Sequence, residues 1–196
     1  GPNMTGIIIQ SRLGSTRLPR KSLLPIAGKP SIRHTVERCL ETGFPVVLAV
    51  PEGEGQEFRD VIGDRCPIFE GHPTDVLDRY HEAAKAFKFD PIVRITGDCP
   101  LIDSNMIKAM TKYFKEYADG DYCSNCHPIR TVPKGMDIEI FSFTGLKQVW
   151  ETTNNYLNSP SLMHSEIYYS LREHVTKFFY HYHPGDCLIY SPPFPD

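Results

Sequence analysis

The segment after Ile9 carries side chains that could bind phosphate. It places a glycine among four cations, in the order Gln10-Ser11-Arg12-Leu13-Gly14-Ser15-Thr16-Arg17-Leu18-Pro19-Arg20-Lys21. Gly14 would let the backbone approach a ligand, and the following amides could donate to phosphate oxygens. Arg12, Arg17 and Lys21 could neutralise charge on a pyrophosphate group. The spacing is neither that of the Walker loop nor that of the dinucleotide loop, so we expect another kind of polyphosphate site, with a solvated basic loop as the alternative.

A second candidate site follows the apolar run at residues 92–95, where Gly97 and Asp98 precede Pro100. We expect Asp98 to point from the carboxyl end of a strand. Magnesium is usually held by one or two carboxylates together with substrate phosphates, so Asp98 is the candidate metal ligand. The alternative role, a helix cap, suits Asp103 or Ser104 better.

These residues need a parallel sheet to position them. Short apolar, β-branched runs occur at residues 7–9, 46–50, 68–69 and 92–95, and segments of helical period follow Ser31, Thr74 and Ser104. This alternation predicts an α/β fold of right-handed βαβ units, with helices on both faces of the sheet. Ligands of such sheets bind beyond the carboxyl ends of the strands, where the loops after Ile9 and Ile95 lie.

The pattern changes from about residue 121. We expect a strand over residues 136–143, a helix over 144–153 and a polar linker over 154–160. Phe178, Phe179, Tyr180 and Tyr182 form an aromatic cluster. Large aromatic side chains dominate both cores and interfaces, and we expect core packing here, with a subunit contact as the alternative.

The composition limits the class of protein. A chain of 196 residues that is 40% hydrophobic suits one globular domain, expected over residues 4–196, with residues 1–3 resembling the remnant of a cleaved tag. The net charge of -3 gives no bulk attraction to nucleic acid or acidic membranes. No apolar run approaches the ~20 residues that span a bilayer, and no export signal is evident. We therefore expect a cytoplasmic protein.

The six cysteines should be reduced thiols in such a protein. Cys123, Cys126 and His127 match the spacing of covalent haem attachment, but that chemistry requires export. We therefore expect neither haem nor zinc at this motif.

Five segments together resemble a known family over nearly the whole chain. They are Arg12-x-Gly14-Ser15-x-Arg17-Leu18-Pro19-x-Lys21, Gly28-Lys29-Pro30, Asp75-Val76-Leu77-Asp78-Arg79, Arg94-Ile95-Thr96-Gly97-Asp98-Cys99-Pro100-Leu101-Ile102-Asp103 and Arg172-Glu173-His174-Val175-Thr176. The chain thus resembles the spore-coat polysaccharide biosynthesis cytidylyltransferase-like family, which is similar to CMP-ketodeoxyoctonate and CMP-acylneuraminate synthetases. The resemblance implies a Rossmann-like three-layer α/β/α sandwich with a mostly parallel sheet. It also implies Mg²⁺-dependent transfer of CMP from CTP to a sugar, sugar acid or sugar phosphate, with release of pyrophosphate, in surface polysaccharide biosynthesis.

The resemblance also assigns roles to individual residues. The catalytic residues would be Arg12, Lys21 and Asp98, the last also being the metal ligand. The nucleotide would be bound by Gln10, Leu13, Gly14, Ser15, Arg17, Asp78, Arg79 and Thr96. The acceptor would be bound by Asp137, Glu139 and His174.

The chain departs from the family pattern at two places. Arg20 stands where the family commonly has glycine. The family usually continues into a segment containing Asp-Thr-Pro-Glu-Asp, which would supply a second metal-binding carboxylate. We therefore expect either a C-terminally truncated chain or a different way of holding Mg²⁺, with Asp137 as the substitute ligand.

Two alternative functions are also compatible with the sequence. A glycosyltransferase that uses a nucleotide-sugar would share the sheet, and Asp137-x-Glu139 imitates its carboxylate motif. A non-catalytic nucleotide-binding homologue is the third reading. His34, His72 and His174 are either proton acceptors or structural residues. The expected partners are CTP and a small sugar-like acceptor, without nucleic acid or membrane, while the acceptor's identity, the strictness for CTP and a homodimer stay undecided.

Overall fold

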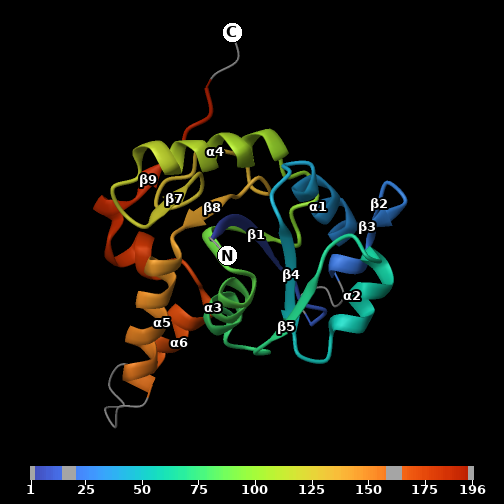
Figure 1. Ribbon diagram of the computed structural model, residues 1–196, viewed down its shortest axis with the longest axis horizontal. Coiled ribbons are helices and arrows are strands. Elements are labelled where there is room, and N and C mark those ends of the chain that lie inside the picture. Colours follow the sequence, from blue (N-terminus) through green and yellow to red (C-terminus); the bar gives the residue numbers. More distant parts are fainter. Residues whose placement is uncertain (1–2, 15–20, 158–164, 194–196) are drawn as a thin grey trace.

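The computed structural model describes residues 3–14, 21–157 and 165–193 and shows a sheet flanked by helices (Figure 1). Its described part contains a seven-stranded sheet in the order β5-β4-β1-β6-β8-β7-β9. The strands are β1 (Met4–Gln10), β4 (Val46–Pro51), β5 (Ile68–Gly71), β6 (Phe89–Thr96), β7 (Tyr122–Ser124), β8 (Glu139–Phe141) and β9 (Leu188–Ile189). A small hairpin of β2 (Pro25–Ile26) and β3 (Lys29–Pro30) lies apart from it.

The sheet is mostly parallel, as expected. Strands β5, β4, β1 and β6 all pair in parallel, and β8 pairs antiparallel with both β6 and β7. Strand β9 pairs in parallel with β7. Strand β8 therefore runs against the direction shared by the other strands.

Helices cover both faces because the central strands are apolar on both sides. Ile7 and Ile9 pack with residues of α1 (Ser31–Leu40), α2 (Gly55–Ile62) and α4 (Ser104–Tyr117). Ile8, which points the other way, packs with residues of α3 (Val76–Phe87) and α5 (Phe143–Leu157). Helix α6 (Ser165–Glu173) packs against α3 and α5 (Figure 1). The expected three-layer α/β/α sandwich is thus confirmed.

The strands and helices expected before residue 120 are present, but α2 and the β2–β3 hairpin were not expected. The later elements differ in length from the expected ones. The strand expected over 136–143 is confined to β8, and α5 begins one residue before the expected helix. The linker expected from residue 154 is wrong as far as Leu157, because α5 continues to that residue; residues 158–160 lie outside the described residues. In the aromatic cluster, Phe179 is buried and stacks on Tyr122, whereas Tyr182 is 45% exposed.

The register brings the ends of the central strands together. Gln10 at the end of β1 lies beside Ala49 of β4 and Thr96 of β6. The loops that follow these parallel strands therefore meet at one edge of the sheet. Asp103 caps α4 by accepting hydrogen bonds from the amides of Asn105 and Met106, which confirms the capping role expected for it.

Candidate active site

Two adjoining cavities lie at the carboxyl edge of the sheet. The smaller has a volume of about 250 Å³ and the larger about 650 Å³. Gln10 and Arg12 line both. The smaller is also lined by Ser11, Gly14, Lys21, Ser22, Thr96, Gly97 and Asp98. Both loops singled out in the sequence thus border the same space.

The smaller cavity brings a cation and a carboxylate face to face. Lys21 Nζ lies 3.5 Å from Asp98 Oδ2, and the two side chains are 56% and 49% exposed. Thr96 Oγ1 donates to Asp98 Oδ1 at 2.8 Å. Arg12 is exposed at the rim. These groups form a polar, accessible site suited to an anionic ligand.

Specific contacts hold the loop after β1. The hydroxyls of Ser11 and Ser22 are hydrogen-bonded at 2.7 Å, and the amide of Leu13 donates to Glu54 Oε1 at 2.5 Å. A Cβ atom on Gly97 would lie 2.7 Å from Ser11 Oγ, so glycine lets the two loops approach. The Leu13 amide is thus occupied by a carboxylate, while Gly14 is exposed. Ser15 and Arg17, both expected to bind nucleotide, lie outside the described residues.

The larger cavity is lined by the loop before α3 and by the end of α6. Its lining residues are Gln10, Arg12, His72, Pro73, Thr74, Asp75, Val76, Arg79, Arg94, Tyr169, Arg172, Glu173 and His174. Arg79 is buried and donates to the carbonyl oxygen of His72 at 2.9 and 3.1 Å. Asp78 does not line either cavity, because its Oδ1 accepts from Trp150 Nε1 at 2.8 Å.

Arg172 links three helices in the wall of this cavity through hydrogen bonds. Its Nη1 donates to Asp75 Oδ2 at 2.8 Å and its Nε donates to Thr153 Oγ1 at 2.8 Å. The bond to Asp75 joins α6 to the cap of α3, and the bond to Thr153 joins α6 to α5. His174, which follows α6, lines the cavity with its side chain 55% exposed.

A buried polar chain runs beneath the junction of the two cavities. Arg94 Nη2 donates to Gln10 Oε1 at 3.0 Å, and Arg94 Nη1 donates to Glu139 Oε1 at 2.6 Å. Glu139 Oε2 also accepts from the hydroxyls of Tyr122 and Thr176. Burial raises the pKa of Tyr122 well above its usual value, and the Glu139 charge adds to this rise. Burial by itself would lower the pKa of Arg94, but the charge and hydrogen bond of Glu139, together with Tyr80, leave that pKa above its ordinary value.

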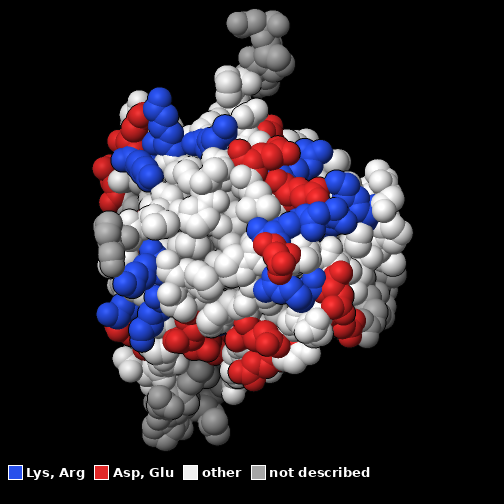
Figure 2. All heavy atoms as spheres, turned by 45° about the vertical axis from the view of Figure 1, so that its right-hand side comes forward, with Lys and Arg blue, Asp and Glu red and all other residues white. Residues whose placement is uncertain are grey.

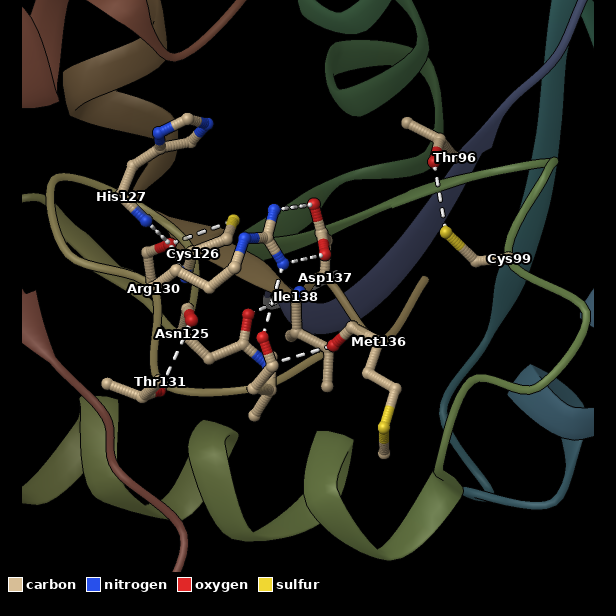
Figure 3. Close-up of polar contacts among 12 residues, drawn as sticks. Thr96, Cys99, Asn125, Cys126, His127, Arg130, Thr131, Met136, Asp137 and Ile138 are labelled. Carbon is tan, nitrogen blue, oxygen red and sulfur yellow. Dashed lines mark hydrogen bonds and ion pairs between the residues drawn. The ribbon is translucent and has the colours of Figure 1, made fainter. Parts of the chain in front are cut away.

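Two of the three expected acceptor residues lie outside both cavities. Glu139 is 5% exposed and belongs to the buried chain. Asp137 is held by both terminal nitrogens of Arg130, at 2.7 and 2.9 Å (Figure 3). To serve as a metal ligand, Asp137 would have to leave this bidentate pair.

Donor atoms of Cys126, His127 and Glu139 lie within 4.8 Å of one another. Cys123 does not belong to this group. Burial raises the pKa of the Cys126 thiol to about 12, and the Glu139 carboxylate is already hydrogen-bonded. A metal ion there would have to displace the proton of Cys126 and the hydrogen bonds of Glu139.

Arg94, Arg172 and Glu54 had no role predicted from their sequence positions. For Arg94 a signal was present, because a cation inside the apolar run at residues 92–95 must find a buried partner. For Glu54 no local pattern distinguishes a carboxylate that caps a distant amide from a solvated one.

A third cavity, of about 560 Å³, lies at the opposite edge of the sheet, where β7 and β9 begin. It is lined partly by Asp121, Gln148 and Asp186. On the face that carries α1 and α2, Lys and Arg side chains alternate with Asp and Glu (Figure 2). No helix in the described part of the chain has the length and apolar character of a membrane span.

Comparisons with known proteins indicate one family. A family model described as cytidylyltransferase matches residues 6–185. The structure of a cytidylyltransferase from Leptospira borgpetersenii is 30% identical, with a TM-score of 0.80, and the match covers 99% of this chain and 78% of that one. A 3-deoxy-manno-octulosonate cytidylyltransferase of Thioalkalivibrio sulfidiphilus is 31% identical over 135 residues, which is 67% of this chain and 54% of that protein.

The spore coat polysaccharide biosynthesis protein SpsF of Bacillus subtilis is 32% identical over 130 residues, or 60% of this chain and 53% of that protein. The matched part of this chain spans about half the length of these two curated relatives, and 65% of the length of a third, from Methanocaldococcus jannaschii.

Proposed function

The chain belongs to the cytidylyltransferase family, and from this premise we propose that it transfers CMP from CTP to a sugar acid or related sugar acceptor and releases pyrophosphate. The family match confirms the resemblance drawn from the sequence motifs. The observation that carries the proposal is the pairing of Lys21 with Asp98 beside Arg12, in a cavity that opens into a larger one.

The smaller cavity suits the triphosphate. Lys21 and Arg12 would neutralise charge on the phosphates and on the departing pyrophosphate, which is the main contribution a protein makes to such transfers. The half-exposed Asp98 carboxylate fits a magnesium ion, which prefers carboxylate and phosphate oxygens. Bound there, Mg²⁺ would supply charge neutralisation between the phosphates. An acceptor oxygen would attack the α-phosphorus in line with the leaving pyrophosphate, and the chain's residues would position both reactants.

The larger cavity suits the nucleoside and the acceptor. Its volume of about 650 Å³ lies within the usual range for small-molecule sites. The exposed His174 and Arg12 border it and offer donors to an anionic sugar. A 3-deoxy-manno-octulosonate cytidylyltransferase among the relatives supports a sugar acid as the acceptor class. The spore coat relative supports a role in surface polysaccharide synthesis.

The positions of Asp137 and Glu139 give the glycosyltransferase alternative no support. That reading needs two carboxylates at the nucleotide site, whereas Asp137 pairs with Arg130 and Glu139 is buried with Arg94. Neither residue lines the two cavities.

The test is pyrophosphate release with CTP, Mg²⁺ and a panel of sugar acids and sugar phosphates, with ATP, GTP and UTP in parallel. We expect release that depends on CTP and on one class of acceptor. Lys21→Ala and Asp98→Asn should each lower turnover by about 10²–10³-fold, because each removes a preorganised charge from the site.

Matched controls are Lys112→Ala and Asp60→Asn, which change the same residue types on the surfaces of α4 and α2. They should leave turnover unchanged. Near-normal turnover in Lys21→Ala or Asp98→Asn would contradict the proposed site. Nucleotide binding without turnover on any acceptor would favour the non-catalytic reading.

A further inference from the structure

We infer that Arg94 locks the carboxamide of Gln10 in one orientation, so that its NH2 group faces the nucleotide and selects cytosine over uracil. This inference rests on the proposed function, because it assumes that the cavities hold a pyrimidine nucleotide. Gln10 would contact the base directly, whereas Arg94 would be a positioning residue.

The orientation of the Gln10 carboxamide follows from the chemistry of its partner. A guanidinium group has only donors, so the side-chain atom that faces Arg94 Nη2 at 3.0 Å must be the oxygen. The two N–H donors on Nε2 then point elsewhere. Within the described ranges no acceptor is recorded for them, and Gln10 lines both cavities. Gln10 Nε2 therefore offers N–H donors to a ligand where the two cavities meet.

Arg94 is itself unable to turn freely. Its Nη1 is committed to Glu139 at 2.6 Å, and its guanidinium carbon lies 5.6 Å from the ring centre of Tyr80. Glu139 is fixed in turn by the hydroxyls of Tyr122 and Thr176. Flipping the Gln10 carboxamide would set an N–H against a buried cation, and moving Arg94 would break a buried ion pair. The contacts of Arg94 and Glu139 thus fix the Gln10 carboxamide with its NH2 group towards the cavities.

The position of Gln10 places it beside the nucleoside. The smaller cavity holds Lys21 and Asp98 and suits phosphates, so base and ribose must extend into the larger cavity. Gln10 borders both cavities, and a nucleotide that spans them passes over its carboxamide.

Cytosine and uracil present different atoms to such a donor. In cytosine, N3 is an acceptor that can take one N–H of the Gln10 carboxamide. In uracil, N3 carries a hydrogen and would oppose the amide donors. A locked donor therefore favours one base by attraction and disfavours the other by repulsion.

The decisive variant is Gln10→Glu. Its carboxylate keeps a partner in Arg94 but offers only acceptors to the cavity. We expect the ratio of kcat/KM for CTP to that for UTP to fall by about 10- to 100-fold, as expected for one mismatched hydrogen bond. The control Gln148→Glu makes the same change in the cavity at the opposite edge and should leave this ratio unchanged.

The positioning role of Arg94 needs a variant that keeps the sheet folded. The double variant Arg94→Met/Glu139→Met replaces the buried pair by apolar side chains and frees the Gln10 carboxamide to turn. We expect the ratio of CTP affinity to UTP affinity to fall by about tenfold or more, while binding of inorganic tripolyphosphate stays unchanged. If Arg94 had a purely structural role, the affinities for CTP, UTP and tripolyphosphate would all fall by the same factor.

An unchanged CTP to UTP ratio in Gln10→Glu would overturn the inference. So would an unchanged base ratio together with a lost preference for CTP over dCTP, because the carboxamide would then contact the ribose. If the unaltered chain binds neither CTP nor UTP by calorimetry, the proposed function fails and this inference fails with it. If it binds both equally tightly, the inference alone fails.

Discussion

At the scale of single residues, the least expected feature is the buried charge pair in the middle of the sheet. Glu139 was expected near the acceptor, yet it receives hydrogen bonds from Arg94, Tyr122 and Thr176. Each of these groups satisfies the Glu139 carboxylate in a place that water does not reach. We therefore expect Glu139 to contribute to the stability of the fold.

Removal of one partner should therefore be costly. We predict that Glu139→Ala lowers the free energy of unfolding by about 3 kcal/mol, because Arg94, whose side chain is only 16% exposed, would lose its partner. Urea denaturation measures the loss. The control Glu116→Ala removes an exposed carboxylate that lies 4.0 Å from Lys112 and should cost under ~1 kcal/mol. Similar losses in the two variants would contradict the role assigned to Glu139.

Sequence patterns predicted which residues come together after the strands, but they did not predict the partners of residues that are paired across the fold. Gln10, Arg12, Lys21 and Asp98 come together because parallel strands end at one edge of the sheet, which periodicity predicts. Asp78 and Asp137 were also expected at the site, and in the structure they are hydrogen-bonded to Trp150 and Arg130. Nothing in the local sequence selects those partners.

At the scale of elements, the strongly periodic segments were predictable and their ends were not. The long β-branched runs gave β1, β4 and β6, since only strands bury such runs on both faces. Helix α5 passes the expected end at Thr153 because Arg172 binds the carbonyl of Trp150 and the side chain of Asn154. Tertiary contacts thus outweigh the weak helix propensity of asparagine.

The cap of α4 provides a test at this scale. Asp103 accepts from the amides of Asn105 at 2.8 Å and Met106 at 3.2 Å. We predict that Asp103→Ala lowers the free energy of unfolding by about 1 kcal/mol, because two backbone donors lose their acceptor. Asp103→Asn retains an acceptor and should recover most of the loss. Equal unfolding midpoints in urea for the two variants would show that capping is not what Asp103 contributes.

At the scale of the whole molecule, the cysteines report on the integrity of the core. All six are free, five are buried, and Cys187 is intermediate. Burial, with the nearby Asp186 charge, raises the pKa of Cys187 to about 11, and burial raises that of Cys123 to about 12. Their thiols therefore stay protonated at neutral pH.

This predicts slow alkylation of the folded chain. A short pulse of iodoacetamide at pH 8 should leave the five buried cysteines unmodified, whereas all six should react in urea. Modification of Cys187 should become faster as the pH rises towards 11, because the thiolate is the reactive form. Mass spectrometry counts the modified sites. Rapid labelling of Cys39 or Cys123 at pH 8 would contradict the packing described above.

The central place of β1 in the sheet has a consequence for the way the protein is made. Strand β1 ends at Gln10, but its neighbour β6 begins at Phe89, so the ribosome must add a long stretch of chain before the pair can form. Protein synthesis adds roughly 5–20 residues per second, so the edge of β1 that pairs with β6 stays unpaired for several seconds. Gln10 and Thr96 can come together only after β6 has been synthesised. A nucleotide bound between these strands therefore cannot stabilise the nascent chain before Thr96 has been added.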